Sequence, residues 1–401
     1  MTAITELKLA SISHLNKTDL ENKVVLVRVD YNVPMDGLTI TDDTRIRSSF
    51  PTIDHLIEAD AKVVLVTHMG RPKGKVVDAF RLKPIYQYFR THFSYDIQYV
   101  EDTIGSDVED VISSMPKGSI LLLENVRFYN QETENDLAFS QELAKLADIF
   151  VQDAFGAVHR AHASTAGVAQ YLPTYMGLLV EKEVEFLSRA VSSPERPYTA
   201  IIGGAKVSTK IEVIKNLLTK VDHLVIGGAM AFTFLKAKGF AVGKSLYEEE
   251  FVALAKDLMD QAEKLGKELI LPDDVVVTDS ISKPTITKTV DVANIDHDLM
   301  GVDVGPKSLQ VLKDIINTSN MIVWNGPLGV FEVDEFSTGT CECARYLASS
   351  NGVTIVGGGD SIAALEKVKL SANMTHISTG GGACLEFLEG KVLPGIDVIG
   401  R

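Results

Sequence analysis

The chain has 401 residues, of which 45% are hydrophobic and 23% are charged, and its formal net charge is 39 − 54 = −15. This composition excludes a disordered chain, a collagen and a coiled coil, and a typical size of about 150 residues per domain predicts two or three domains. The negative charge disfavours binding to nucleic acid or to an anionic membrane. The N-terminal segment has no basic start followed by an apolar run, so the sequence predicts no signal peptide. No apolar run approaches the length of about 20 residues that spans a bilayer.

Cys341, Cys343 and Cys384 are the only cysteines. Three thiols form no even disulfide framework, and the first two lack a second pair at the spacing of a structural zinc site. Small buried side chains are the simplest interpretation. We therefore expect a protein of the reducing cytoplasm.

Short β-branched runs recur along the chain, each followed by a polar or glycine-rich turn and then by a segment with helical spacing. In the first half they predict strands at Val24–Val29, Lys62–Thr67, Ile97–Val100, Ser119–Leu123 and Ile149–Val151. In the second half they predict strands at Tyr198–Ile202, His223–Ile226, Glu268–Leu271, Met321–Val323 and Val353–Val356. Helices are predicted at Ile211–Leu218, Phe251–Leu265 and Ile362–Val368. This alternation is typical of doubly wound α/β domains with mainly parallel, Rossmann-like sheets.

The two series of strands meet near residues 172–197. The segment GLLVEKEVEFLSRAVSS is rich in helix formers, with Glu185 four residues before Arg189, and Ser192-Ser193-Pro194 ends it. We expect this helix, within residues 173–193, to join two lobes at a hinge, although a surface helix inside one lobe would give the same pattern. The predicted lobes comprise residues 1–172 with about 379–401, and residues 194–378.

Charged and imidazole side chains follow the predicted strands of the first half. Ligands of open α/β sheets bind beyond the carboxyl ends of the strands, and eight of the 12 arginines fall within residues 28–160. One arginine alone would be better explained as a surface charge. The cluster predicts a pocket for a small polyanion, because guanidinium groups pair with two oxygens of a carboxylate or phosphate. The candidates are Arg28, Asp30, Asn32, Arg45, His68, Arg71, Arg127 and Arg160, with His159 and His162 beside them.

Glycines stand at the corresponding places of the second half. The predicted strands there run into Gly203-Gly204-Ala205-Lys206, Gly227-Gly228 and Gly357-Gly358-Gly359-Asp360-Ser361. Glycine lets the backbone approach a phosphate closely, and the helix that follows offers free N–H groups. None of these turns is a Walker A loop or a clean G-x-G-x-x-G, and each alone could be merely a tight turn. Three in one lobe favour a nucleotide.

Lys206 and Lys210 are four residues apart, at the start of a helix predicted from Val207 onward. At that spacing their side chains would share one face. Two ammonium groups near a helix N-terminus oppose the helix dipole unless an anion lies between them.

Two carboxylates have alternative interpretations. Asp360 is either a cap of the helix at Ile362–Val368 or a ligand of Mg²⁺, which prefers one or two carboxylates together with substrate phosphates. Glu332, which follows Trp324-Asn325-Gly326-Pro327, is either a surface carboxylate or a ligand of a ribose.

Together these residues resemble the phosphoglycerate kinase family. The matching segments run in the family's order across nearly the whole chain: VRVDYNVP, THMGRP, LLLENVRF, HRAHAST, GGAKVSTKI, WNGPLGVFE, GGGDS and STGGGACLEFLEGK. The sequence departs from the family pattern at Thr209, at Ala163-Ser164 and in VVDAFRLKP. None of these departures replaces a proposed ligand.

The resemblance implies reversible phosphoryl transfer between 1,3-bisphosphoglycerate and ADP, giving 3-phosphoglycerate and ATP, by a cytoplasmic monomer. The N-terminal lobe would bind the acid, and the C-terminal lobe would bind Mg-ADP or Mg-ATP. Arg28 and Lys206 would be catalytic, and Asp360 would hold Mg²⁺. The substrate-binding residues would be Asp30, Asn32, Arg45, His68, Arg71, Arg127 and Arg160. The nucleotide-binding residues would be Lys210, Gly227, Gly301, Asn325, Glu332, Gly357, Gly358, Gly359, Asp360 and Ser361, with Thr379–Gly382 completing the phosphate surroundings.

Two other functions remain as alternatives. A nicotinamide-dependent dehydrogenase also has two α/β lobes, but it predicts a G-x-G-x-x-G after an early strand and an acidic residue about 20 positions on, and the first half has neither. A two-lobed binding protein for phosphorylated metabolites would explain the arginines but not the separate lobe of glycines and lysines.

Overall fold

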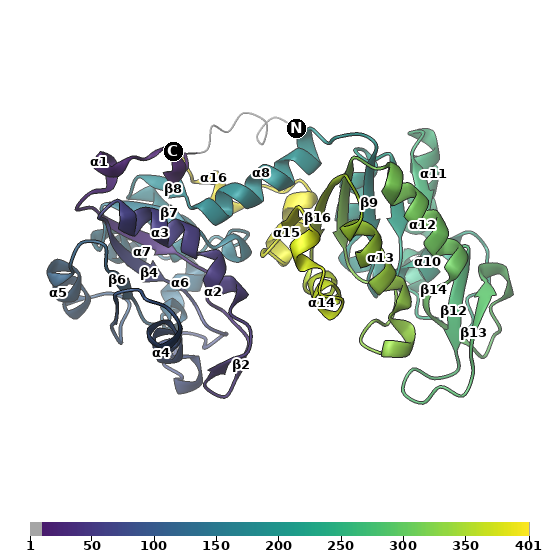
Figure 1. Ribbon diagram of the computed structural model, residues 1–401, viewed down its shortest axis with the longest axis horizontal. Helices are drawn as coiled ribbons and strands as arrows, with labels where there is room; N and C mark the ends of the chain where they lie inside the picture. Colours follow the sequence, from purple (N-terminus) through teal and green to yellow (C-terminus); the bar gives the residue numbers. More distant parts are fainter. Residues whose placement is uncertain (1–9, 401) are drawn as a thin grey trace. The chain divides into compact units, whose positions relative to one another are not determined.

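The computed structural model describes residues 10–400 (Figure 1). Within these residues the chain forms two compact units, which we call unit 1 (residues 10–185 and 392–400) and unit 2 (Phe186–Lys391). The boundary at 185/186 falls inside helix α8, Leu178–Ser192, which the sequence predicts as a connecting helix. The expected limits of the two ligand-binding lobes stay a prediction.

Unit 1 is built on a six-stranded parallel sheet in the order β5-β6-β4-β1-β7-β8. Successive residues of β1 face different apolar clusters: Val25 and Val27 belong to one, and Leu26 belongs to the other. The sheet is therefore buried on both faces, which explains its continuous apolar runs. Its strands are β1 (Val24–Arg28), β4 (Lys62–Val66), β5 (Ile97–Tyr99), β6 (Ile120–Leu122), β7 (Ile149–Gln152) and β8 (Thr174–Met176).

Helices cover both faces of this sheet, and a short hairpin precedes α2. The helices are α1 (Lys17–Leu20), α2 (Thr44–Ser48), α3 (Phe50–Glu58), α4 (Lys83–His92), α5 (Ser106–Ser114), α6 (Asn130–Glu134), α7 (Leu137–Lys145) and α16 (Pro394–Asp397). The hairpin joins β2 (Met35–Asp36) to β3 (Thr39–Ile40). A single π-helical turn, η5, spans Ala163–Gly167.

The end of the chain completes unit 1. The Gly395 N–H donates to the carbonyl of Val158 at 2.8 Å, and Ile396 and Ile399 are buried. Helix α16 packs against η5. Unit 1 is thus assembled from the two ends of the described chain.

Unit 2 repeats the architecture with the strand order β11-β10-β9-β15-β16-β17, again all parallel. Its strands are β9 (Tyr198–Ile202), β10 (His223–Ile226), β11 (Glu268–Ile270), β15 (Met321–Asn325), β16 (Val353–Gly357) and β17 (His376–Ile377). Its helices after α8 are α9 (Ile211–Leu218), α10 (Met230–Ala237), α11 (Val252–Lys264), α12 (Pro306–Thr318), α13 (Thr338–Ala348), α14 (Gly359–Lys367) and α15 (Gly382–Leu388).

A small antiparallel sheet with its own apolar cluster lies beside the main sheet of unit 2 (Figure 1, green). It has the order β13-β12-β14, from β12 (Asp274–Thr278), β13 (Thr287–Asp291) and β14 (Met300–Val304).

The α/β class with two doubly wound parallel sheets is confirmed, and each of the ten predicted strands forms. The sequence did not predict the edge strands β8 and β17 or the antiparallel sheet. Among residues 10–400, no helix combines the length and the apolar character needed to cross a bilayer.

Candidate functional site

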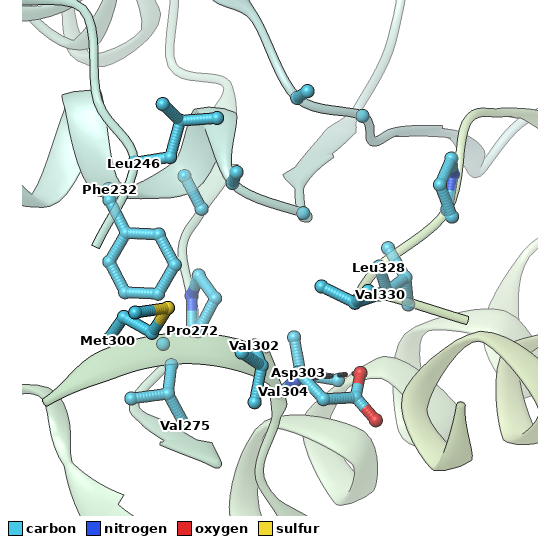
Figure 2. A pocket seen from close by; sticks show the side chains of 18 of the residues that line it. Phe232, Leu246, Pro272, Val275, Met300, Val302, Asp303, Val304, Leu328 and Val330 are labelled. Carbon is cyan, nitrogen blue, oxygen red and sulfur yellow. Dashed lines mark hydrogen bonds between the residues drawn. The ribbon is translucent and has the colours of Figure 1, made fainter. Parts of the chain in front are cut away.

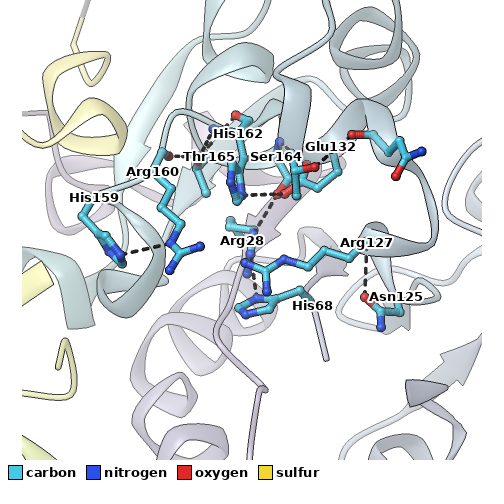
Figure 3. A network of polar contacts seen from close by, with 12 residues as sticks. Arg28, His68, Asn125, Arg127, Glu132, His159, Arg160, His162, Ser164 and Thr165 are labelled. Atoms are coloured by element: carbon cyan, nitrogen blue, oxygen red, sulfur yellow. Dashed lines mark hydrogen bonds and ion pairs between the residues drawn. The ribbon is translucent and has the colours of Figure 1, made fainter. Parts of the chain in front are cut away.

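Arg28 lies at the carboxyl end of β1, near the middle of the unit 1 sheet, and its side chain is fully buried. Its Nε donates to the hydroxyl of Ser164 at 2.9 Å, and its Nη1 donates to the carbonyl of Val29. Its Nη2 lies 3.0 Å from Nδ1 of His68, which follows β4 (Figure 3). The fold therefore brings together two predicted residues from neighbouring strands.

The His68 ring is electrically neutral at physiological pH. Burial, followed by the charge of Arg28, lowers the pKa of His68 well below its ordinary value. Because Arg28 can only donate, the Nδ1 of His68 must accept, and the ring proton is placed on Nε2. His68 can thus donate one hydrogen bond from Nε2.

Asp30, Asn32 and Arg45 form a connected group beyond β1. Arg45 donates to the Asp30 carboxylate at 3.0 Å and to the Asn32 carbonyl at 3.1 Å. The Asn32 side chain accepts the N–H of Gly70 at 2.9 Å, and the carbonyl of Gly70 accepts from Arg127 at 2.9 Å. Four of the predicted substrate residues are therefore joined through one loop.

Positive charges crowd at this edge of unit 1. Burial, followed by the charge of Arg28, lowers the pKa of Arg127 to about 10, with Arg160 contributing in the same direction. The Nε of Arg127 is buried and has no hydrogen-bond partner among the described residues. A bound anion would relieve both the repulsion and the unsatisfied donor.

The remaining predicted arginines are exposed. Arg160 donates from Nε to His159 at 3.1 Å, and Arg71 follows the loop at Gly70. His162 lies deeper, with Nδ1 at 3.6 Å from a carboxylate oxygen of Glu132. No motif singles out Glu132, although it is fully buried beside Arg28.

The glycine turns of unit 2 interlock at the carboxyl edge of its sheet. Gly203 donates its N–H to the carbonyl of Asn325 at 2.9 Å, and Gly204 donates to the carbonyl of Pro327 at 3.0 Å. A Cβ on Gly203 would overlap the Pro327 carbonyl, and one on Gly227 would overlap the Leu328 side chain. These two glycines are therefore required for packing between the turns. Gly359, by contrast, has open space where a Cβ would lie.

The prediction that a helix begins at Val207 is wrong. A 3₁₀ turn, Val207–Thr209, comes first, and α9 begins only at Ile211. Lys206 and Lys210 therefore flank this turn and do not share one helical face. Lys206 is exposed, whereas burial lowers the pKa of Lys210 to about 8.

Asn325 connects the lysine segment to the last glycine turn. Its Oδ1 accepts from the ammonium of Lys210. Its Nδ2 is buried without a hydrogen-bond partner among the described residues and faces Gly358. An acceptor such as a phosphate oxygen would satisfy this donor.

The start of α14 excludes one of the two interpretations of Asp360. The N-cap is Gly358, with φ of 91°, and no side chain caps the helix. Asp360 lies in the first turn and is exposed, so it is not the cap. The hydroxyl of Ser361 accepts the N–H of Gly326 at 2.7 Å and so fixes the turn after β15 to α14.

An apolar pocket of about 360 Å³ lies beside these turns within unit 2 (Figure 2). Its volume is in the range that holds a nucleoside-sized ligand. The lining includes Phe232, Leu246, Pro272, Val275, Met300, Val302, Leu328 and Val330. Gly204, Gly228 and Asp360 also line it, so the pocket opens toward the glycine turns.

Two further predicted residues belong to this pocket. Gly301 lies in its wall, where a Cβ would overlap the ring of Phe232. Glu332 is exposed and lines the same pocket. The sequence missed Asp303, a buried wall residue whose carboxylate accepts the N–H groups of Val304 at 2.9 Å and Gly339 at 2.7 Å. Nothing in the sequence around Asp303 indicates that its carboxylate accepts these two N–H groups.

The residues around Asp360 fit a magnesium ion held partly by a ligand. Among residues 10–400, no group of three His, Cys, Asp or Glu side chains could hold a metal ion. A single exposed carboxylate at a pocket rim matches the preference of Mg²⁺ for few protein ligands, phosphates and water.

Comparisons with known proteins agree over nearly the whole chain. Residues 15–391 match the family model described as phosphoglycerate kinase. The chain is 50% identical over 382 residues to a phosphoglycerate kinase of Moorella thermoacetica, covering 95% of this chain and 97% of that one.

Solved structures give the same answer. The phosphoglycerate kinase of Coxiella burnetii matches with a TM-score of 0.89 and 42% identity, and that of Pyrococcus horikoshii matches with a TM-score of 0.80 and 32% identity. Each match covers 97% of this chain and 98% of the other. The chain belongs to the phosphoglycerate kinase family.

Proposed function

We propose that the phosphoglycerate kinase reaction of this chain is divided between its two units. Unit 1 binds 3-phosphoglycerate or 1,3-bisphosphoglycerate, and unit 2 binds ADP or ATP. One contrast carries this division: unit 1 gathers buried guanidinium groups with an unsatisfied donor, whereas unit 2 has an apolar pocket that opens on glycine turns. The first suits a small polyanion, and the second suits a nucleoside with its phosphates.

The chemistry requires no catalytic base. In the direction of ATP consumption, a carboxylate oxygen of 3-phosphoglycerate attacks the γ-phosphorus, and the bond from that phosphorus to the β-phosphate oxygen breaks. The carboxylate is already deprotonated at neutral pH, so catalysis rests on positioning and on neutralising charge. Arg28 and Lys206 neutralise the transferred group.

Other unit 1 residues bind the acid. Asp30 and Asn32 contact its hydroxyl and carboxyl region, and His68 donates to it from Nε2. The cations that hold its negative groups are Arg45, Arg71, Arg127 and Arg160.

On the nucleotide side, Gly301 and its neighbours surround the base, and Glu332 accepts from the ribose hydroxyls. Lys210, Asn325 and the N-terminus of α14, from Gly357 to Ser361, bind the phosphates. The orphan Nδ2 of Asn325 supports this placement. Asp360 would hold Mg²⁺, which supplies charge neutralisation on the phosphate oxygens. Gly227 contributes to the nucleotide site by letting its turn pack against Leu328.

A coupled assay of ATP formation from 1,3-bisphosphoglycerate and ADP tests the function directly. A binding protein or a dehydrogenase would form no ATP. We expect addition of a chelator to abolish the activity and excess Mg²⁺ to restore it. Activity that persists in the chelator would contradict the magnesium assignment.

Arg28→Ala and Lys206→Ala test the division of labour. Each should lower kcat about 100-fold or more, because a charge that neutralises the transition state is lost. Far-ultraviolet circular dichroism should show that the fold persists. Unchanged kcat in both variants would remove the catalytic assignment.

We further expect a cytoplasmic monomer. Cys341, Cys343 and Cys384 are all buried free thiols, as a reducing compartment permits. Sedimentation at micromolar concentration tests the oligomeric state.

A further inference from the structure

Glu132 is a buried carboxylate that the reaction scheme does not use. It lies in α6 and is 0% exposed. Both of its oxygens are bound to one residue of η5: Oε2 accepts the Ser164 N–H at 2.8 Å, and Oε1 accepts the Ser164 hydroxyl at 2.7 Å (Figure 3). This two-point contact fixes the serine.

The serine passes the contact on to Arg28. A hydroxyl has one hydrogen, and that of Ser164 goes to Glu132, so its oxygen is free to accept. It accepts the Nε–H of Arg28 at 2.9 Å. Glu132, Ser164 and Arg28 therefore form a chain of hydrogen bonds in which all three side chains are fully buried.

The chain joins opposite charges in the interior. Burial opposes ionisation of Glu132, but the contacts with His162, Arg28 and Ser164 together lower the pKa of Glu132 below its ordinary value. The carboxylate is thus the buried counter-charge of Arg28. Hydrogen bonds in such a buried chain polarise and strengthen one another.

Two N–H groups of the guanidinium are not used in these contacts. Arginine has five N–H donors, and Ser164, the Val29 carbonyl and His68 each take one. One N–H remains on each terminal nitrogen. Their direction is set by the Nε contact at one edge and the His68 contact at the other.

We propose that Glu132 and Ser164 are positioning residues, which hold the Arg28 guanidinium in the orientation that phosphoryl transfer needs. The proposal rests on the proposed function, because it takes Arg28 as the group that neutralises the transferred phosphoryl. Without the hydroxyl, the buried Nε–H loses its acceptor and the guanidinium can turn toward another one. A small misplacement of a catalytic group costs up to about 100-fold in rate.

A double-mutant cycle tests the inference with 3-phosphoglycerate and ATP as substrates. Ser164→Ala in the otherwise unchanged chain should lower kcat about 10- to 100-fold, as losses of supporting hydrogen bonds do, and change both KM values less than threefold. In a chain that already carries Arg28→Ala, the same substitution should change kcat less than twofold. A serine that only stabilised the fold would lower kcat equally in both backgrounds.

Glu132→Gln provides the second variant. It keeps the shape and one acceptor oxygen but removes the charge, so it should reproduce part of the loss and show the same dependence on Arg28. It also takes the place of Ser164→Ala in the cycle if that variant does not fold.

Ser140→Ala is the matched control. Ser140 is also a fully buried serine of unit 1, but its hydroxyl donates to the Asp136 carbonyl at 2.7 Å. It should lower the unfolding temperature as much as Ser164→Ala does and leave kcat unchanged.

The outcomes distinguish a failure of the catalytic assignment of Arg28 from a failure of the positioning role of Glu132 and Ser164. If Arg28→Ala alone retains wild-type kcat, the catalytic assignment of the proposed function fails. If Arg28→Ala loses activity but folded Ser164→Ala does not, or if the serine effect is the same without Arg28, only the positioning inference is overturned.

Discussion

Gly301 shows how the absence of a side chain shapes the apolar pocket of unit 2. The ring of Phe232 lies where a Cβ of residue 301 would be, and both residues line the pocket. The N–H of Gly301 donates to the Ser245 hydroxyl at 2.9 Å, which fixes the strand at that point. The ring can hold its place only because residue 301 is glycine.

Gly301→Ala should therefore push the Phe232 ring into the pocket. We expect KM for ADP to rise at least 10-fold, since a reduced cavity loses contact with the base, while KM for 1,3-bisphosphoglycerate stays unchanged. Steady-state kinetics with each substrate varied in turn measures both values. Adding Phe232→Leu should restore much of the affinity because leucine lacks the outer ring atoms. An unchanged KM for ADP in Gly301→Ala would contradict the assignment of the pocket.

The sequence predicts site residues that stand next to a recognisable strand. It does not predict residues whose role depends on a partner that is distant in the sequence. Arg28 and His68 were predicted because each follows an apolar run, and the fold brings them to 3.0 Å. Glu132 follows no strand, and its partner Ser164 is 32 residues away. Asp303 likewise meets Gly339 only in the folded chain. Neither carboxylate differs in sequence from a surface acid.

At the level of elements, the start of α8 depends on one buried acid. Asp153 follows β7, and its Oδ1 accepts the N–H groups of Leu179 at 3.0 Å and Val180 at 3.4 Å. Burial raises the pKa of Asp153 to about 7, although its hydrogen bonds with Thr52 and these two N–H groups act in the opposite direction. The helix that crosses the unit boundary thus begins on a carboxyl group that titrates near neutral pH.

This raised pKa predicts how stability changes with pH. The folded chain binds the Asp153 proton more tightly than the unfolded chain, whose carboxyl group has the ordinary pKa of 3.8. The stabilisation is therefore complete below about pH 3.8 and is lost as pH rises through about 7, by at most about 4 kcal/mol. Asp153→Asn keeps an acceptor and cannot ionise, so its unfolding free energy should fall less than that of the wild type between pH 5 and 8.

Urea unfolding followed by two signals measures this difference. Trp324, the only tryptophan, is buried in unit 2, so its fluorescence reports that unit alone. Circular dichroism reports both units. The unfolding free energies of the wild type and of Asp153→Asn should differ in their pH dependence when measured by circular dichroism and agree when measured by fluorescence. Parallel pH profiles of the two proteins in both signals would exclude the role of Asp153.

The strength of the sequence signal explains which elements were predicted. Three of the four residues of β10 and all five of β9 are buried, in mainly apolar runs, and α9 ends at Leu218 as predicted. Strand β17 has only two residues, and β13 is largely exposed. Such segments pair because neighbouring strands supply an edge, and that edge exists only in the folded unit.

At the scale of the whole molecule, the two proposed catalytic cations belong to different compact units, Arg28 to unit 1 and Lys206 to unit 2. For both cations to act on one phosphoryl group, we propose that the two units close around the bound ligands and exclude water. We expect the radius of gyration from small-angle scattering to decrease when 3-phosphoglycerate and a non-hydrolysable ATP analogue are both bound. Either ligand alone should have a smaller effect. An unchanged radius with both bound would count against closure.

The last residues of the chain have a consequence for biosynthesis. Unit 1 begins near the N-terminus, but it is completed by Gly395, Ile396 and Ile399, which are translated after all of unit 2. Because α16 packs on η5, the turn that carries Ser164, these late residues also support the surroundings of Arg28. During synthesis, unit 2 can therefore fold first, and unit 1 completes its packing only once the residues that follow unit 2 have been made.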